Sequence, residues 1–90
     1  MPGQKYKVSF TVKALSDIED FTDTDYDWIL KGCLRLQEDP SPDGKHVKKL
    51  RGYKNLYRLR IGDYRAVFEW QADIVTVFRI LTRQDFGKKY

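Results

Sequence analysis

The chain has 90 residues, enough for one domain and too few for two, and its single cysteine, Cys33, excludes an internal disulfide. Its start has no long apolar run of the kind found in signal peptides and membrane spans, so we expect one soluble domain over residues 1–90, in the cytoplasm and with no membrane partner. The net charge of +4 arises in residues 45–90, which hold twelve Lys/Arg and four Asp/Glu, and this favours a polyanionic partner, most commonly nucleic acid.

The chain begins with a pattern of period two, which predicts a first strand. Its apolar positions are Tyr6, Val8, Phe10 and Val12. From Ala14 the spacing becomes helical, with Leu15, Ile18 and Phe21 on one face and acidic residues, among them Asp17, on the other. A short amphipathic helix is therefore expected after the first strand.

A second helix is predicted to start after one of three residues that are good helix N-caps, Asp23, Thr24 and Asp25, and to run to about Glu38. Its apolar stripe follows the spacing i, i+3, i+4, i+7 and consists of Tyr26, Ile29, Leu30, Cys33, Leu34 and Gln37. The two helices are expected to form a hairpin. Residues 39–44 contain two prolines and a glycine, which predicts a connecting loop.

The second half of the chain is predicted to be a series of strands. Residues 56–61 and 64–70 alternate on either side of Gly62-Asp63, which predicts a β-hairpin, and a turn at residues 71–73 leads to a strand over residues 74–81. The expected order is βααβββ. We expect an α+β fold in which a helical hairpin packs on one face of a mostly antiparallel four-stranded sheet.

Strand parity places three arginines together. Leu59 shares one side of its strand with other apolar residues, so Arg58 and Arg60 lie on the opposite side, and the same argument adds Arg65 from the next strand. Guanidinium groups on adjacent strands repel one another unless an anion lies between them, and each can bind a phosphate through two N–H groups. The alternative is a solvated sheet face on which these arginines pair with Glu69 and other carboxylates.

Residues 44–68, GKHVKKLRGYKNLYRLRIGDYRAVF, carry a recognisable motif. They resemble the central signature of RelE-type toxins of the RelE/ParE superfamily, in which a Lys-Leu-x-Gly segment precedes a Tyr-Arg-x-Arg strand and a Gly-Asp-Tyr-Arg turn. The resemblance extends over the whole chain, since the family also begins with a strand and a helical hairpin and ends with a strand followed by an arginine such as Arg83. The dense set of strand arginines places the chain on the RelE side of the superfamily.

The resemblance implies a toxin of a type II toxin–antitoxin system that is held inactive by a cognate antitoxin protein. It implies an endoribonuclease that cleaves mRNA at the ribosomal A site by attack of a 2′-hydroxyl, giving a 2′,3′-cyclic phosphate, with no metal and no small-molecule cofactor. By motif, the catalytic residues are Arg58, Arg60, Arg65 and Arg83. Tyr90 is expected to stack on a base or to assist proton transfer, and the alternative is a frayed terminal residue. Arginine is a poor general base, so the proton acceptor stays open.

Five further basic residues form a surface run that either is solvated or binds RNA phosphates: Lys45, Lys48, Lys49, Arg51 and Lys54. Core packing is favoured over function for Cys33, Trp28 and Trp70, and no Cys/His spacing indicates a metal site. Two alternative functions remain open. One is a ParE-like toxin that inhibits another target, such as DNA gyrase, by binding, and the other is a nucleic-acid-binding module without catalysis.

Overall fold

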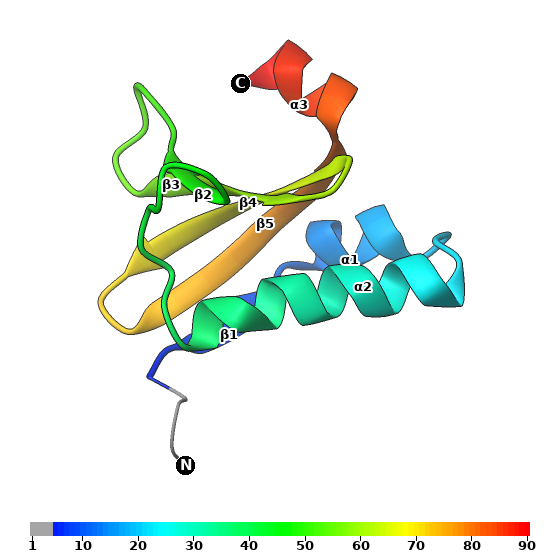
Figure 1. Cartoon of the computed structure of the whole chain (residues 1–90), viewed down its shortest axis with the longest axis horizontal. Helices are drawn as coiled ribbons and strands as arrows, with labels where there is room; N and C mark the ends of the chain where they lie inside the picture. Colours follow the sequence, from blue (N-terminus) through cyan, green and yellow to red (C-terminus); the bar gives the residue numbers. More distant parts are fainter. Residues whose placement is uncertain (1–4) are drawn as a thin grey trace.

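The computed structural model describes residues 5–90, which form a mixed sheet with helices on both faces (Figure 1). The elements follow one another as β1 (Lys7–Phe10), α1 (Val12–Ile18), α2 (Asp23–Leu34), the 3-10 helix η1 (Arg35–Gln37), β2 (Val47–Lys49), β3 (Leu56–Ile61), β4 (Tyr64–Gln71), β5 (Ile74–Thr82) and α3 (Arg83–Lys89). The five strands lie in the order β1-β5-β4-β3-β2. Only β1 pairs in parallel, with β5. None of the helices formed by these residues is long and apolar enough to cross a membrane.

The α+β class predicted from the sequence is confirmed, but the sheet has one strand more than expected and the chain ends in a helix. The additional strand, β2, has three residues, of which only Val47 is buried. Such a segment has no alternation of its own, and pairing with β3 makes it a strand. The additional helix, α3, has no buried residue, but Thr82 caps it by accepting a hydrogen bond from the Asp85 amide.

The first strand ends earlier than its alternation predicts, because Thr11 begins a helix instead. The Thr11 hydroxyl accepts a hydrogen bond from the Ala14 amide and donates one to the carbonyl of Phe78. The assignment of Val12 to the strand is therefore wrong, and this side chain is 85% exposed in the first turn of α1. The Thr11 cap gives a hydrogen-bond partner to the Ala14 amide, which has none within the first turn of the helix.

Asp17 does not face solvent as predicted but closes the edge of β5. Strand β1 ends opposite Val77, so the Ile80 amide lies beyond its reach, and Asp17 Oδ2 accepts a hydrogen bond from that amide at 2.9 Å. The same carboxylate binds Arg79 with both oxygens, at 2.8 and 3.1 Å. Burial raises the pKa of Asp17, but the bonds from Arg79 and Ile80 outweigh burial and lower it overall.

Helix α2 starts and faces differently from the prediction. Its N-cap is Thr22, one residue before the predicted cap residues, and the α-helical part ends at Leu34. Tyr26 and Leu34 are exposed, and the buried stripe consists of Ile29, Cys33 and Leu36. The predicted buried face is rotated about the helix axis relative to the observed one, because Tyr26 and Leu34 are apolar enough to be mistaken for residues that pack against the sheet.

Two hydrophobic clusters lie on opposite faces of the sheet. The larger one fills the space between the sheet and helices α1 and α2 and includes Ile18, Ile29 and Phe68. The smaller one lies on the other face, beneath α3, and consists of Leu50, Leu56, Val67, Leu81 and Phe86. A β-bulge at Val67/Phe68 shifts the register with β5, which places Ile80 in the larger cluster and Leu81 in the smaller.

Candidate functional site

The β3–β4 hairpin sets the register of the arginines. Gly62 lies in its turn with a φ of +57°, a conformation that favours glycine, and the Arg83 amide donates a hydrogen bond to the Asp63 carbonyl at 2.7 Å. This turn places Arg60 directly opposite Arg65. Like charges at such positions destabilise a sheet, and an anion bound between them removes the penalty.

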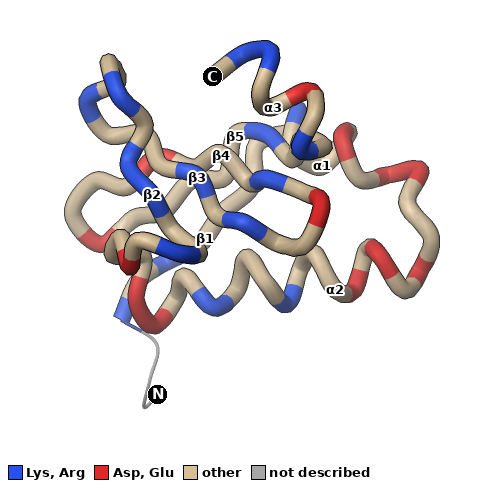
Figure 2. Tube along the Cα trace, turned by 45° about the horizontal axis from the view of Figure 1, so that its top comes forward, with Lys and Arg blue, Asp and Glu red and all other residues tan. Residues whose placement is uncertain are grey.

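The next pair along β3 extends the same cationic face. Arg58 lies directly opposite Lys48 of β2 on one side and Val67 of β4 on the other. Directly opposite residues share a face, so Lys48 and Arg58 lie on the same side as Arg60 and Arg65, away from α1 and α2. Figure 2 shows the basic residues gathered along β2 and the β3–β4 hairpin, whereas acidic residues cluster around the α1–α2 connection.

Backbone carbonyls, not carboxylates, hold two of these guanidinium groups. Arg58 Nη1 donates to the carbonyl of His46 at 3.0 Å and to that of Lys45 at 3.5 Å. Arg65 Nη1 donates to the carbonyls of Gly62 and Tyr64, at 2.8 and 2.9 Å. Each arginine therefore keeps Nε and Nη2 free of these bonds, which is the edge of a guanidinium that binds a phosphate with two N–H groups.

The electrostatics of the two residues show that the cationic groups act on one another. Burial lowers the pKa of Arg58, and Arg60 lowers it further. The pKa of Arg65 is lowered by burial first and then by Arg58, Arg60 and Arg83. Both arginines remain charged at neutral pH, because their usual pKa lies above about 12. The four arginines thus form one electrostatic unit, the arginine cluster: Arg58, Arg60, Arg65 and Arg83.

No arginine of the cluster forms a salt bridge with a described carboxylate. Among residues 5–90 the ion pairs are Lys31–Asp27 and Arg79–Asp17, and His46 contacts Asp43 in a pair that is ionic only when the imidazole is protonated; none of these contacts involves the cluster. The alternative of arginines paired with Glu69 is therefore not what the structure shows. A set of unpaired cations on a sheet face is suited to bind a polyanion.

The predicted run of five basic residues does not act as one surface. Lys48 faces the arginine cluster, but Lys49 lies opposite Tyr57 on the other face of the sheet, where its Nζ donates to the Tyr53 carbonyl at 2.7 Å. The other three are exposed in the loops before and after β2: Lys45, Arg51 and Lys54. Sequence reasoning missed this division, because a three-residue strand shows no alternation.

Tyr90 has a defined place. Its ring stacks on Phe86 with centroids 5.3 Å apart and lies 5.6 Å from the ring of Tyr53, in the loop that follows β2. The hydrogen bonds of Arg58 and Arg65 go to backbone carbonyls and not to Tyr90. Helix α3 thus carries Arg83 at its start and an aromatic group at its end, across the face that bears the arginine cluster (Figure 1).

Other chemically active residues are in structural environments. Burial raises the pKa of the Cys33 thiol to about 12, which excludes a thiolate nucleophile at neutral pH. Trp70 Nε1 donates to the Ala72 carbonyl, as expected for a packed indole, whereas Trp28 is half exposed and lies against Gly62. Within residues 5–90 no group of three His, Cys, Asp or Glu residues could hold a metal ion.

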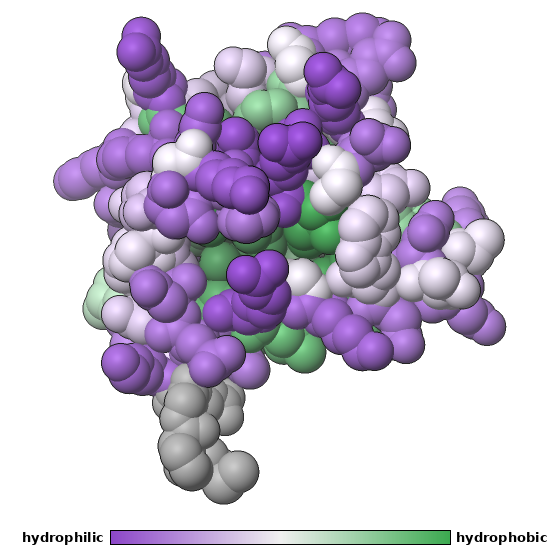
Figure 3. Space-filling model, in the orientation of Figure 1, coloured by the Kyte–Doolittle hydropathy of each residue, from purple (hydrophilic) through white to green (hydrophobic). Residues whose placement is uncertain are grey.

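A hollow between α2 and β3 was not predicted. It has a volume of about 320 Å³, and its apolar floor includes the buried side chains of Leu59 and Ile61. Basic residues form part of its rim: Lys31, Arg35, His46 and Arg60. Figure 3 shows hydrophobic residues at the bottom of this hollow, surrounded by hydrophilic ones.

Residues 8–85 match the family described as ParE toxin of type II toxin-antitoxin system. The chain is also 42% identical over 38 residues to Toxin RelE3 of Methanocaldococcus jannaschii, a match that covers 42% of this chain and 43% of that protein. The chain thus spans less than half the length of this curated relative.

Solved structures share the fold. An archaeal RelE-RelB complex from Pyrococcus horikoshii has a TM-score of 0.72 at 26% identity, covering 88% of this chain and 96% of that one. A RelB-RelE antitoxin-toxin complex from Methanococcus jannaschii gives 0.71 at 26% identity, with 90% and 96% covered. A mutant of the E. coli toxin RelE in the free state gives 0.73 at 23% identity, with 92% and 88% covered, a similarity of fold.

Proposed function

The chain belongs to the ParE toxin family of type II toxin–antitoxin systems and is a RelE-type member of the RelE/ParE superfamily, and from this premise we propose that it is an endoribonuclease that cleaves mRNA at the ribosomal A site. One observation carries the proposal: the arginine cluster lies on the sheet face away from α1 and α2 without an ion-pair partner in residues 5–90. Such a face suits an RNA phosphate.

The reaction we propose needs no metal. The 2′-oxygen attacks the adjacent phosphorus, the bond from phosphorus to the 5′-oxygen breaks, and the products are a 2′,3′-cyclic phosphate and a 5′-hydroxyl. Charge builds up on the phosphoryl oxygens in the transition state, and preorganised donors stabilise it more than they stabilise the substrate. One such donor is worth about 3–4 kcal/mol when removed. Arg58, Arg60, Arg65 and Arg83 are the donors in this proposal.

Proton transfer requires a group other than arginine. A proton must leave the 2′-hydroxyl and another must reach the 5′-oxygen, and arginine holds its protons too tightly for either step. We assign proton transfer to Lys48, because it lies directly opposite Arg58 on the face of the arginine cluster. Tyr90, held by Phe86 and Tyr53, is in this proposal a surface on which an RNA base stacks.

We propose that three of the other basic residues bind ribosomal RNA. Lys45, Arg51 and Lys54 are exposed in loops beside the arginine cluster, so they can reach rRNA phosphates without contacting the scissile bond. Lys49 lies on the other face of the sheet and donates to the Tyr53 carbonyl. We assign it a structural role in the loop that follows β2.

We also propose that a cognate antitoxin binds this chain with an acidic amphipathic segment. The hollow between α2 and β3 supports this, because its floor is apolar at Leu59 and Ile61 and its rim carries basic side chains such as Arg35 and Arg60. The Pyrococcus horikoshii and Methanococcus jannaschii structures are both complexes of RelE with RelB. A partner that covers Arg60 also neutralises part of the arginine cluster.

The decisive experiment maps the 5′ ends of mRNA after expression of the chain and on programmed ribosomes with purified protein. We expect new ends that carry a 5′-hydroxyl and depend on ribosomes. The Arg65→Ala protein is the matched control, since Arg65 bonds only to carbonyls of its own hairpin and its loss should leave the fold intact. Intact mRNA in the presence of growth arrest by the wild type would contradict the proposal.

A second function is favoured by one observation, the match to the family of ParE toxins. In that case the chain inhibits a target such as DNA gyrase by binding, and the arginine cluster only holds the target. The same expression experiment separates the two functions, because growth arrest then occurs with intact mRNA and Arg65→Lys retains full toxicity.

A further inference from the structure

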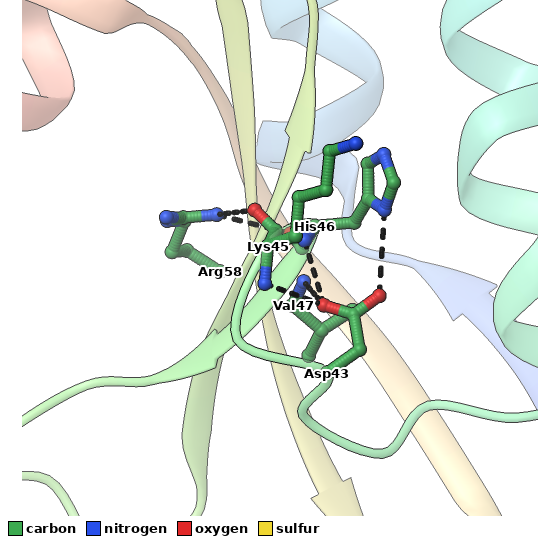
Figure 4. A network of polar contacts seen from close by, with 5 residues as sticks. All are labelled: Asp43, Lys45, His46, Val47 and Arg58. Carbon is green, nitrogen blue, oxygen red and sulfur yellow. Dashed lines mark hydrogen bonds and ion pairs between the residues drawn. The ribbon is translucent and has the colours of Figure 1, made fainter.

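An exposed carboxylate, Asp43, organises the loop that precedes β2. Its Oδ1 accepts hydrogen bonds from three successive backbone amides, those of Lys45, His46 and Val47, at 2.9, 2.7 and 3.0 Å (Figure 4). Its Oδ2 lies 3.4 Å from Nδ1 of His46. One side chain therefore fixes the backbone of the loop that enters β2.

This loop ends at the carbonyl that holds Arg58. The His46 carbonyl accepts a hydrogen bond from Arg58 Nη1 at 3.0 Å and another from the Arg60 amide at 2.8 Å. The Lys45 carbonyl accepts from the same Nη1 at 3.5 Å. Figure 4 shows Asp43 on one side of this loop and the Arg58 guanidinium on the other, so the loop backbone connects the two.

Holding a cation by carbonyls differs from holding it by a carboxylate. A carboxylate bound directly to Arg58 would neutralise the charge that a phosphate needs and would occupy two of its five N–H groups. Carbonyl groups use only Nη1 and leave the net charge in place. Asp43 thus contacts Arg58 only through the backbone and does not compete with a phosphate for its N–H groups, while its charge offsets part of the pKa lowering that burial and Arg60 cause in Arg58.

Asp43 is unsuited to act as a base. Amide donors, those of Val47 and Lys45 foremost, hold the pKa of its carboxyl far below the usual range. It is therefore ionised at neutral pH and a poor acceptor for the proton of a 2′-hydroxyl. Its hydrogen bonds are committed to the loop.

We propose that Asp43 is a positioning residue of the arginine cluster, which fixes the His46 carbonyl and through it the orientation of the Arg58 guanidinium. The effect on catalysis rests on the endoribonuclease activity proposed above, but the effect on Arg58 itself does not. Without Asp43 the loop loses three amide contacts, and Arg58 then samples orientations in which its free edge no longer faces the phosphate. A misplacement of about 1 Å at a catalytic group can slow a reaction by about 100-fold.

The test compares two aspartates of the same loop. Asp39 Oδ1 accepts a hydrogen bond from the Ser41 amide at 2.9 Å but has no connection to Arg58, which makes Asp39→Ala the matched control. Single-turnover cleavage on programmed ribosomes should slow by about 10- to 100-fold in Asp43→Ala and stay unchanged in Asp39→Ala. Asp43→Asn keeps the Oδ1 acceptor and should retain the rate within about threefold.

A double-mutant cycle shows whether Asp43 acts through Arg58. The Asp43→Ala/Arg58→Ala protein should cleave no more slowly than Arg58→Ala alone, because the loop then has no guanidinium to orient. Multiplicative rate losses, or equal losses in Asp39→Ala and Asp43→Ala, would overturn the proposal.

A readout without RNA separates this proposal from the proposed function. In NMR spectra of the free protein, Arg58 Nε–Hε should lose order in Asp43→Ala and keep it in Asp39→Ala. If the wild type cleaves no RNA but Arg58 loses order as expected, the endoribonuclease assignment fails and the positioning role stands. Unchanged order of Arg58 in Asp43→Ala refutes the positioning role whatever the enzyme activity.

Discussion

Replacement of Asp17 by alanine tests the account of the β5 edge. The change removes an amide bond at 2.9 Å from Ile80 and a two-oxygen contact with Arg79 at 2.8 and 3.1 Å. Hydrogen bonds to a charged group contribute about 1.5–3 kcal/mol each. Because Arg79 keeps part of its hydration, its two bonds to Asp17 together should contribute no more than one such bond. The free energy of unfolding should fall by about 3 kcal/mol, and Tm by about 15 °C for a domain of this size.

The assay is urea unfolding of the wild type and of two variants. Asp27→Ala is the control, because Asp27 forms an exposed ion pair with Lys31 at 4.0 Å and should contribute less than about 0.5 kcal/mol. An Asp17→Ala protein that loses less than about 1 kcal/mol would refute the reasoning, since the sheet edge would then be stable without the carboxylate.

The pH dependence gives a second measurement of the same interaction. The pKa of Asp17 is lower in the folded protein than in the unfolded chain, so its stabilisation is complete above the unfolded value of about 3.9. It is lost as the pH falls through the folded value. The difference in stability between the wild type and Asp17→Ala should therefore shrink below about pH 4. A difference that grows in acid would contradict the sign of the shift.

Four further predictions concern the arginine cluster and the core. Arg65→Ala should abolish growth arrest with unchanged urea unfolding, and Arg65→Lys should keep RNA affinity while it loses the two-N–H contact and thus cleavage rate. Lys48→Ala should slow single-turnover cleavage by about tenfold or more, whereas Lys49→Ala, on the other face, should leave it unchanged; equal rates would show that Lys48 only adds charge. Gly62→Ala should lower the free energy of unfolding in urea by about 2–3 kcal/mol, because the backbone there has a φ of +57° and the new Cβ would clash with the Trp28 ring. Gly44→Ala is the control: its φ is +78° but its Cβ would point into open space, so the loss should be about 1 kcal/mol. Cys33 should resist iodoacetamide at pH 8 in the folded protein and react in urea, since burial raises its pKa to about 12; rapid labelling without urea would indicate local opening.

The sequence predicts the arginine side of the sheet well, and the reason is local. Alternation in residues 56–61 and 64–70 is uninterrupted, and Gly62 fixes the register between them, so Arg60 and Arg65 are opposite each other as strand parity implies. Prediction from the sequence fails where a partner distant in the chain determines the local structure. Val47–Lys49 becomes a strand because β3 lies beside it, and Asp17 finds the Ile80 amide 63 residues away.

The same distinction applies to the candidate site. Motif resemblance selects Arg58, Arg65 and Arg83, and after burial the charges of Arg58 and Arg83 both help to lower the pKa of Arg65, as expected for a common location. It does not select Asp43, whose role depends on which carbonyl its loop presents to Arg58. Nor does it separate Lys48 from Lys49, because the direction of each side chain is set by pairing with β3.

The parallel pairing of β1 with β5 has a consequence for how the protein is made. Residues 7–10 pair with residues 74–77, so the sheet cannot close until residues 74–77 have been synthesised. At about 5–20 residues per second, a nascent chain spends several seconds with β1 unpaired. Local pairing favours early formation of the β3–β4 hairpin, whereas Arg83 and α3 follow β5 and join last. The arginine cluster is therefore completed late in folding, when β5 and the start of α3 have joined the β3–β4 hairpin.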